Sequence, residues 1–375
     1  MRKHIIYRYF LFLSLVGLMQ LTLSCSSSSN EIEPLKPEGE DTPLEKDEYT
    51  FMNVEYRKWQ NGTFQAWTTA DSRETRTIDN MNWYTPSSDY SRTAWGGRIG
   101  LQPSSVVGKE GFFRVANCGG RSYLLDPDNG AVIIHGIQHV RPGESTAHKK
   151  AFGTRYGSEA RWSEETGKLL ADNHINYISY GSNRIEVFPA AVRGNLLTPK
   201  TQKIAYAENL YLLRTFMWDM SKNLGYAFDD DKYNRLVLLF EPTFATYIDR
   251  LVQEKSALFA GDRHFIGFYL DNELPFASYQ GTGYANTEGG GWLVHTQKNR
   301  GEFYQNFCLR LLETRNCVGW VHFEYNDGYD SNGKASNKGV VSIEYEPYES
   351  FLSQMRQLNL SVHSLIDYYD TKSVQ

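Results

Sequence analysis

The hydrophobic pattern is sharpest at residues 131–140, where almost every position is apolar. An unbroken apolar run is typical of a strand in a parallel sheet that is covered on both faces. Two shorter patterns precede it. Residues 111–115 predict a strand, and residues 122–130 predict a strand that ends in an Asp-Pro-Asp-Asn-Gly turn.

Helical and strand patterns alternate along the rest of the chain. Helices are predicted at 158–171, 242–259, 297–314 and 348–369, and strands at 174–180, 210–218, 264–270 and 317–325. This alternation predicts an α/β fold with a parallel sheet, either open or closed into a barrel. Residues 50–125 instead hold scattered tryptophans and turn residues, which indicate a β-rich or irregular segment.

The amino terminus has the pattern of an export signal. Arg2, Lys3 and Arg8 are followed by an apolar run over 9–23, which is too short for a comfortable transmembrane helix. The run ends in Leu-Thr-Leu-Ser before Cys25, a sequence that resembles a bacterial lipobox. We therefore predict a lipoprotein signal peptide over 1–25 with lipidation at Cys25. The alternative is a plain signal peptide in which this cysteine is incidental.

Residues 26–49 are predicted to form an acidic tether. A serine run follows Cys25, and residues 31–48 contain eight acids and two lysines, a net charge of −6. Like charges repel one another and keep such a segment extended. The acidic start resembles the surface-export tethers of Bacteroides-type lipoproteins. This resemblance implies a protein anchored by lipid to the outer membrane, at the cell surface.

Composition narrows the classes of function. The 39 basic and 44 acidic side chains nearly balance, so binding to nucleic acid is not expected. Aromatic residues make up 14% of the chain and can stack on sugar faces, although they also fill cores. No HxH, HExxH or paired-cysteine spacing points to a metal or another cofactor. Cys118, Cys308 and Cys317 are interpreted as buried apolar residues, with a disulfide as the alternative.

Polar residues end three of the predicted strands, at 138–141, 270–273 and 324–327. In a barrel of parallel strands, the reacting groups lie at the carboxyl ends of the strands. A carboxylate at the end of an apolar strand is costly unless it is hydrogen-bonded or used. These three strand ends are therefore the candidate site.

The order of the motifs resembles one enzyme family. Residues 111–140, 155–176 and 240–244 are similar to the entry into the catalytic (β/α)8 barrel of agarase- and porphyranase-like glycoside hydrolases. Residues 265–273 resemble the fourth-strand motif of that family, and residues 296–327 resemble its last helix and eighth strand. The likeness extends from 98 to 369. It implies that residues 126–375 form a catalytic-type domain derived from a TIM barrel.

The same resemblance assigns roles to single residues. It implies that Glu273 is the general acid/base and that Asn272 binds a sugar hydroxyl beside the scissile bond. The expected lining of the sugar cleft completes the set: Trp320 and Tyr325 as rings, with His139, His322 and Asp327 as polar contacts. The implied substrate is a galactan-type polysaccharide whose O-glycosidic bonds are hydrolysed at the cell surface without a cofactor.

One part of the family pattern is missing. Only 45 residues separate Glu273 from Val318 (318 − 273), whereas one βα unit needs about 25–30 residues. Strands five to seven therefore do not fit into this spacing. They include the strand that carries the family's nucleophile. Three carboxylates remain as candidates for the second group: Asp271, Glu324 and Asp327. Asp271 is the poorest of them, because alternation along the strand points it away from Asn272's side.

Three hypotheses follow from an incomplete barrel. The first is an agarase-like hydrolase that acts on a galactan. The second is a degenerate lipoprotein that binds glycans without cleaving them, because it lacks the nucleophile. The third, with the least support, is a structural lipoprotein with no role in carbohydrate chemistry.

Overall fold

The computed structural model describes residues 48–60, 63–87, 89–182, 203–224, 240–271, 292–328 and 336–372, which belong to one folded unit, 47–375. The predicted signal peptide, its Cys25 and almost all of the predicted tether lie outside the described residues. In the described ranges, no helix has the length and apolar character needed to cross a bilayer.

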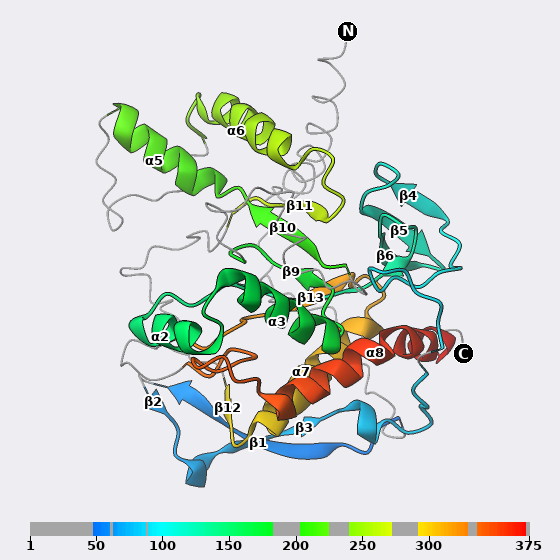
Figure 1. The fold of residues 1–375 in the computed structure, drawn as a ribbon. Helices are drawn as coiled ribbons and strands as arrows, with labels where there is room; N and C mark the ends of the chain where they lie inside the picture. The colour runs from blue at the N-terminus through cyan, green and yellow to red at the C-terminus, as the bar shows by residue number, and fades with distance from the viewer. Residues whose placement is uncertain are drawn as a thin grey trace, which may run out of the picture. The chain divides into compact units, whose positions relative to one another are not determined.

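Five parallel strands form the central sheet (Figure 1). In sheet order they are β11 (Phe265–Tyr269), β10 (Ala205–Asn209), β9 (Tyr177–Ile178), β8 (Ile134–Ile137) and β13 (Gly319–His322). The last strand in sequence thus lies beside the first, with Gly319 opposite Ile134. The predicted α/β fold with a parallel sheet is confirmed. Over the residues that the structure describes, the sheet is open, with β11 and β13 at its edges.

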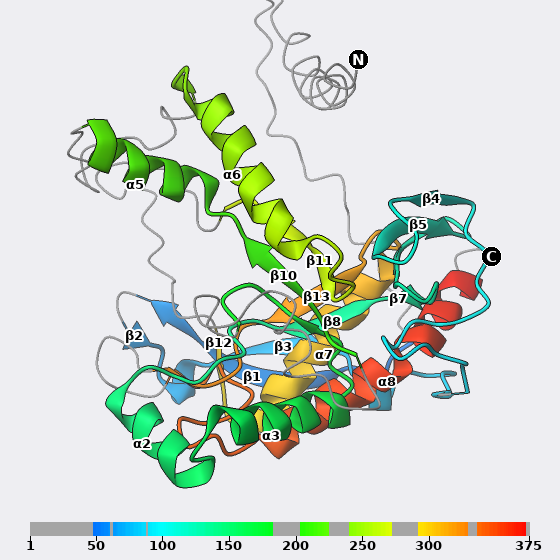
Figure 2. The same ribbon diagram turned by 45° about the horizontal axis from the view of Figure 1, so that its top comes forward.

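Helices cover the sheet and extend from it. They are α2 (Thr146–Arg155), α3 (Glu159–Asp172), α5 (Leu212–Leu224), α6 (Phe244–Phe259), α7 (Gln297–Glu313) and α8 (Glu349–Lys372). Helices α7 and α8 lie side by side and bury Leu309, Leu312 and Leu358 in a core shared with Trp320 of β13 (Figure 2). Burying a leucine or phenylalanine side chain contributes about 1.5–3 kcal/mol, so this contact is a main source of stability.

Most predicted elements are confirmed. The helices predicted at 158–171, 242–259, 297–314 and 348–369 correspond to α3, α6, α7 and α8, and the strands predicted at 264–270 and 317–325 contain β11 and β13. The apolar run 131–140 is divided between two sheets. Its first part, β7 (Ala131–Val132), pairs antiparallel with β6, and β8 then enters the parallel sheet.

The strand predicted at 210–218 is wrong, because this segment belongs to helix α5. Leu213, Phe216 and Met217 lie three and four residues apart, so they share one helix face and pack against α6. The third parallel strand is β10, just before it. Its small alanines and polar end gave no strong strand pattern.

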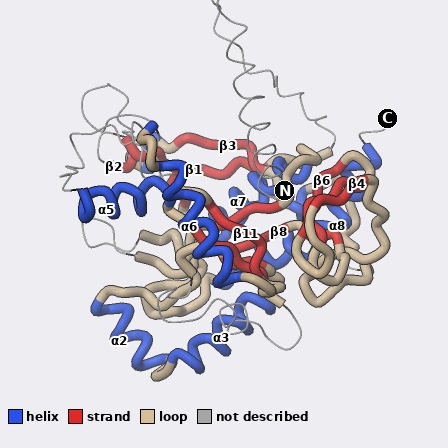
Figure 3. The backbone as a smooth tube through the Cα atoms, turned by 90° about the horizontal axis from the view of Figure 1, so that it is seen from above, coloured by secondary structure: helices blue, strands red, loops and turns tan. Residues whose placement is uncertain are grey.

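Two antiparallel sheets complete the unit, and they lie in different places (Figure 3). One contains β1 (Met52–Gln60), β2 (Thr63–Phe64), β3 (Asp71–Thr75) and β12 (Trp292–Val294). The other contains β4 (Ser105–Val107), β5 (Arg114–Cys118), β6 (Arg121–Leu125) and β7. Short 3-10 turns occupy Trp67–Thr69 and Ile78–Asn80. We predicted a boundary at residue 125. In the β1–β12 and β6–β7 pairs, one strand belongs to residues 50–125 and its partner to residues 126–375.

A buried arginine fastens α8 to the β4–β7 sheet. The Arg121 side chain is fully buried. Its Nε and Nη2 donate to the Asp370 carboxylate at 3.0 and 2.6 Å, and its Nη1 donates to the Leu312 carbonyl at 2.8 Å. Burial alone would raise the pKa of Asp370, but the hydrogen bonds and charges of Arg121 and Arg315 bring it below its ordinary value.

We expect Arg121→Met to lower the free energy of unfolding by about 3–5 kcal/mol, because it removes one partner of a buried ion pair. Urea denaturation followed by tryptophan fluorescence measures this loss. The matched control is Arg161→Met, which removes an exposed pair with Glu165 on α3 and should cost less than about 1 kcal/mol. Equal losses in the two variants would contradict a special role for the buried pair.

Candidate active site

Aromatic rings lie at the carboxyl ends of the parallel strands. His139 follows β8, Tyr180 follows β9, Tyr211 follows β10, Tyr269 ends β11 and Phe323 follows β13. We call these five side chains the ring row. The His139 ring lies 5.2 Å from Phe323 and 6.4 Å from Tyr180, between centroids. Tyr180 in turn lies 4.9 Å from Tyr269 and 6.3 Å from Tyr211.

The ends of the ring row are open to solvent. Phe323 is 44% exposed and Tyr269 is 37% exposed, although both are large apolar side chains. Aromatic rings with a wet face and a polar tip suit ligands that are part apolar and part polar, such as pyranose rings. The row runs across all five strands, and it therefore offers one continuous edge for an extended ligand.

Glu324 and His139 form a polar pair beside the row. The Glu324 Oε2 lies 3.1 Å from the His139 Nδ1, and both side chains are partly buried. His139 has a φ of +54°, in the left-handed region. Gly181 makes room for its ring, because an added Cβ there would lie 2.5 Å from the His139 Cδ2. The site thus holds a carboxylate next to the aromatic edge in a fixed orientation.

Trp320 and Tyr325, expected to line the cleft, are buried. The Trp320 Nε1 donates to the Tyr304 hydroxyl at 2.6 Å, and this side of β13 faces α7 and α8. The Tyr325 hydroxyl lies 3.0 Å from the Thr166 Oγ1 on α3. In this structure neither ring faces an open groove. Phe323, which follows β13 and lies between them in sequence, is the exposed ring of the three.

His322 and Asp327, expected as polar contacts, are held by protein groups. The His322 Nε2 lies 3.0 Å from both Arg300 and the Lys338 carbonyl, and burial, with the charge of Arg300, lowers its pKa to about 3. Asp327 accepts hydrogen bonds from the Gly339 N–H at 2.7 Å and from the Tyr348 hydroxyl at 2.6 Å. Both residues fix the segment that follows β13, and they therefore position Glu324.

Asn272 and Glu273 lie outside the described residues. They come immediately after Asp271, the last described residue of the segment that follows β11. The Asp271 Oδ2 accepts the Leu213 N–H at 3.0 Å and so satisfies a free donor at the start of α5. Burial raises the pKa of Asp271, and the backbone hydrogen bonds oppose that rise. This carboxylate is therefore occupied by the helix terminus.

Sequence reasoning missed most of the ring row and identified His139 alone. The signal was available, because a Tyr or Phe stands at the end of four of the five strands or within two residues after it. Asn209, at the end of β10, was also missed. Its Oδ1 accepts the Tyr211 N–H at 2.8 Å, while its buried Nδ2 has no partner among the described residues. Across the same ranges, no cluster of three His, Cys, Asp or Glu side chains could hold a metal ion.

Comparison with solved structures shows which fold this chain has. The crystal structure of BpGH50 superposes with a TM-score of 0.68 at 19% identity, covering 86% of this chain and 96% of that one. The chain has the BpGH50 fold. Its TM-score to the agarase AgWH50C is 0.46 at 12% identity, over 75% of this chain and 67% of that one. PfGH50B gives 0.44 at 12%, over 75% and 70%. These two superpositions are too loose to support any conclusion about this chain.

No family model and no curated protein matches the sequence. The likeness to BpGH50 therefore rests on structure, and it covers nearly all of that protein. It supports the mixed α/β fold with a parallel sheet. The roles of single residues have to be argued from the geometry of this chain.

Proposed function

We propose that this protein is an agarase-type glycoside hydrolase that cleaves a galactan-type polysaccharide at the carboxyl edge of its parallel sheet. The observation that carries the proposal is the ring row, which lies at this edge on a fold shared with BpGH50. A sugar chain laid along the row would stack on Tyr269 and Phe323 and would pass the carboxylate of Glu324.

Two carboxyl groups would perform the reaction. Retaining glycosidases hold them about 5–5.5 Å apart, one as nucleophile and one as acid and then base. We assign the acid/base role to Glu273, which follows β11, and the nucleophile to Glu324. The hydrogen bond to His139 orients Glu324, whereas Asp271 and Asp327 are both engaged by backbone N–H groups.

The bond changes of that reaction are simple. The Glu324 carboxylate would attack the anomeric carbon while Glu273 protonates the departing glycosidic oxygen. This step leaves a glycosyl ester on Glu324. Glu273, now ionised, would take a proton from water as that water attacks the anomeric carbon, which releases the sugar and restores both carboxyl groups.

The parallel sheet is proposed to be one continuous section of an eight-stranded barrel. Its order β13-β8-β9-β10-β11 corresponds to barrel strands eight, one, two, three and four. The short spacing between Glu273 and Val318 supports the loss of strands five to seven. An open sheet leaves the ring row accessible from the side where those strands would stand.

The missing strands also favour a second candidate function, in which the protein binds the polysaccharide without cleaving it. A Glu324 that is held by His139 but is not placed opposite Glu273 would leave the ring row as a binding surface alone. The Asn209 amide would then serve only as a hydrogen-bond donor to a sugar hydroxyl.

One experiment separates these candidates. The full-length protein is incubated with agarose, porphyran and, as an unrelated glucan, cellulose. Release of reducing ends from a galactan supports hydrolysis. Retardation of the protein in a galactan-containing gel without release of reducing ends supports binding alone. If the protein does neither, both candidates are rejected.

We also propose that the protein is a lipoprotein, lipidated at Cys25 and held at the outer membrane facing outward. The basic start, the apolar run and the acidic residues after Cys25 support this location. In cells, Cys25→Ser is expected to shift the protein from the membrane fraction to the soluble fraction, measured by immunoblotting. An unchanged distribution would refute lipid anchoring.

A further inference from the structure

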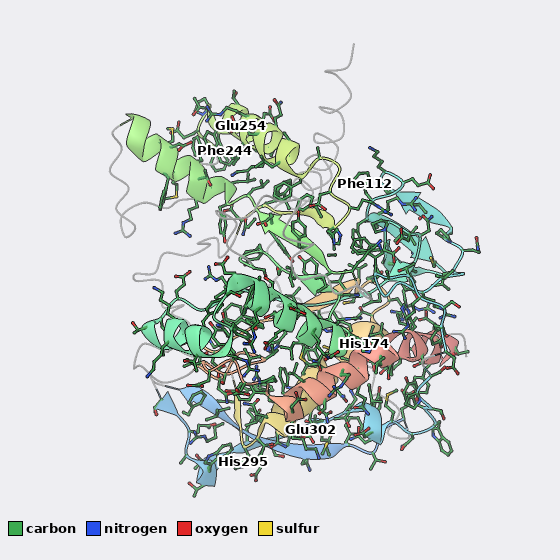
Figure 4. All side chains as sticks on the ribbon, viewed as in Figure 1. Phe112, His174, Phe244, Glu254, His295 and Glu302 are labelled. Atoms are coloured by element: carbon green, nitrogen blue, oxygen red, sulfur yellow. The ribbon has the colours of Figure 1, made fainter. Side chains whose placement is uncertain are left out.

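A pocket lies at the opposite, amino-terminal ends of the strands. It has a volume of about 660 Å³, and its walls come from three separate segments. Arg92 and the Gly96 backbone lie in the segment before β4. His174 lies between α3 and β9 (Figure 4). Arg356 of α8 lines the same pocket. The Lys203 N–H donates to the Ala94 carbonyl just before β10 begins, which fixes this wall to the sheet.

The lining of this pocket is cationic. Arg92 and Arg356 carry two positive charges, and Asp172 is the one acidic residue of the lining. Asp172 forms an ion pair with Lys168 on the same helix, so its charge is compensated there. Arg356 makes only a long contact, 3.8 Å, with the exposed Glu349. The pocket therefore has an excess of positive charge.

Arg92 has hydrogen-bonding capacity left over. Its Nη2 donates to the Leu360 carbonyl at 2.9 Å, which fixes the side chain against α8. Its Nε is buried and has no acceptor among the residues that the structure describes. Burial lowers the pKa of this guanidinium. A buried donor without an acceptor costs about 1–3 kcal/mol, so an anion that reaches the Nε would remove a penalty as well as add an attraction.

His174 can supply a third positive charge, but only when its ring is protonated. Its backbone has a φ of +52°, which places the residue in the left-handed turn between α3 and β9. Burial, followed by the charges of Arg92 and Arg356, lowers its pKa, and Asp172 acts in the opposite direction. The ring is therefore neutral at neutral pH. A bound anion would favour the protonated ring and would bind more tightly as the pH falls.

We propose that this pocket binds a tetrahedral oxyanion, a sulfate or phosphate group, between Arg92, Arg356 and His174. Two guanidinium groups and an imidazole that approach from different segments suit an anion with acceptor oxygens in several directions. A planar carboxylate would be satisfied by one bidentate arginine. The oxyanion can be a free ion or an ester on a polysaccharide, and both have the same recognising chemistry.

The first test is calorimetric titration of the full-length protein with inorganic sulfate and with inorganic phosphate at pH 6. Arg356→Gln is expected to weaken binding about tenfold, the effect of losing a charged hydrogen bond. Arg250→Gln is the matched control, since Arg250 is exposed on α6 and pairs only distantly, at 3.9 Å, with Glu254. Binding that is unchanged in Arg356→Gln, or lost equally in the control, would overturn the proposal.

The second test uses His174→Asn. Asparagine tolerates the left-handed backbone, so this variant keeps the turn and removes the titrating ring. The affinity of the wild-type protein for inorganic sulfate should rise as the pH falls from 7.5 to 5.5, and the variant should lose most of that rise. A wild-type affinity that does not change over this interval would overturn the role of His174.

A sulfated galactan oligosaccharide and its desulfated form identify the source of the anion. Tighter binding of the sulfated form, reduced by Arg356→Gln, assigns the pocket to an ester on the glycan. Binding of the inorganic ions alone assigns it to a free ion. Binding of neither ion nor ester rejects the pocket. Glu273→Gln should leave anion binding intact, so failure of the proposed hydrolysis would be separable from failure of this pocket.

Discussion

Replacing Glu273 by Gln is expected to reduce the release of reducing ends from galactan by about 10²–10⁴-fold, the range contributed by a positioned acid/base. Glutamine keeps the size and the hydrogen-bonding oxygen of the side chain but cannot transfer a proton. The loss should therefore appear in kcat while the protein remains folded. A reducing-sugar assay measures the rate, and circular dichroism checks the fold.

The matched control for this change is Glu254→Gln, on the exposed face of α6 (Figure 4). It alters the charge by the same amount away from the ring row and should leave the rate unchanged. Azide provides a sharper criterion. It attacks a glycosyl ester without a general base, so it should restore turnover of an activated aryl galactoside in Glu273→Gln. A variant with wild-type activity would rule out Glu273 as the acid/base.

Glu324→Gln tests the other half of the mechanism. A nucleophile cannot be replaced by added azide in the same way, because without it the covalent glycosyl ester no longer forms. Loss of activity without recovery of the retained product would support Glu324 as nucleophile. Wild-type activity in Glu324→Gln would exclude that role, and the nucleophile would then have to be another carboxylate.

Mild acid is expected to destabilise the folded protein. Burial lowers the pKa of His135 and of His322 to about 3 and that of His363 to about 4, with nearby arginines adding to the effect. In the unfolded chain a histidine titrates at about 6.5. Between about pH 6.5 and 4 the unfolded state therefore binds protons that the folded state does not, and the free energy of unfolding falls as the pH falls.

The expected slope is large. Each such histidine lowers the free energy of unfolding by roughly 1 kcal/mol for each pH unit of acidification in this interval. Three of them lower it by about 3–4 kcal/mol per unit. The three together should remove about 5 kcal/mol by pH 5, a large share of the about 5–15 kcal/mol that stabilises a folded protein. Above pH 6.5 all three side chains are neutral in both states, and stability should not depend on them.

Urea midpoints at pH 7.5, 6.5 and 5.5 measure this slope. His363→Asn should reduce it by about one third, since one of three groups is removed. His295→Asn is the control, because His295 is exposed and pairs with Glu55 at the surface. A stability that stays constant down to pH 5, or a slope that the His363 variant leaves unchanged, would contradict the assignment.

The sequence was sufficient to predict four of the five parallel strands, and insufficient for β10 and for the side chains at the edge of the sheet. Long apolar runs, such as the one that contains β8, identify buried strands directly. Segment 210–218 was misread because an amphipathic helix and a strand share the same apolar residues over a short window. β10 pairs through the backbone, which leaves little trace in an alanine-rich strand, whereas β9 lies within the strand predicted at 174–180.

Burial explains which candidate residues the sequence could not place. Trp320, Phe323 and Tyr325 are all aromatic, and the motif alone gave no reason to choose among them. Their burial differs: Trp320 faces α7 and α8, Tyr325 is buried against α3, and Phe323, just after β13, is 44% exposed. Tyr180, Tyr211 and Tyr269 were overlooked because they come from distant parts of the chain and meet only when the strands pair.

The pairing of β12 with β1 links the amino-terminal sheet to the region of Glu273. Leu293 lies opposite Arg57 in this pair, while Asp271 is held at the start of α5. The described residues on either side of the twenty that include Glu273 are therefore held, Asp271 by α5 and Leu293 by β1. Strand β1 stands far from Glu273 along the chain, yet cutting it away would remove the partner of β12, which follows the span that contains the proposed acid. Trimming the protein to its parallel sheet would thus cost more than the loss of an accessory segment.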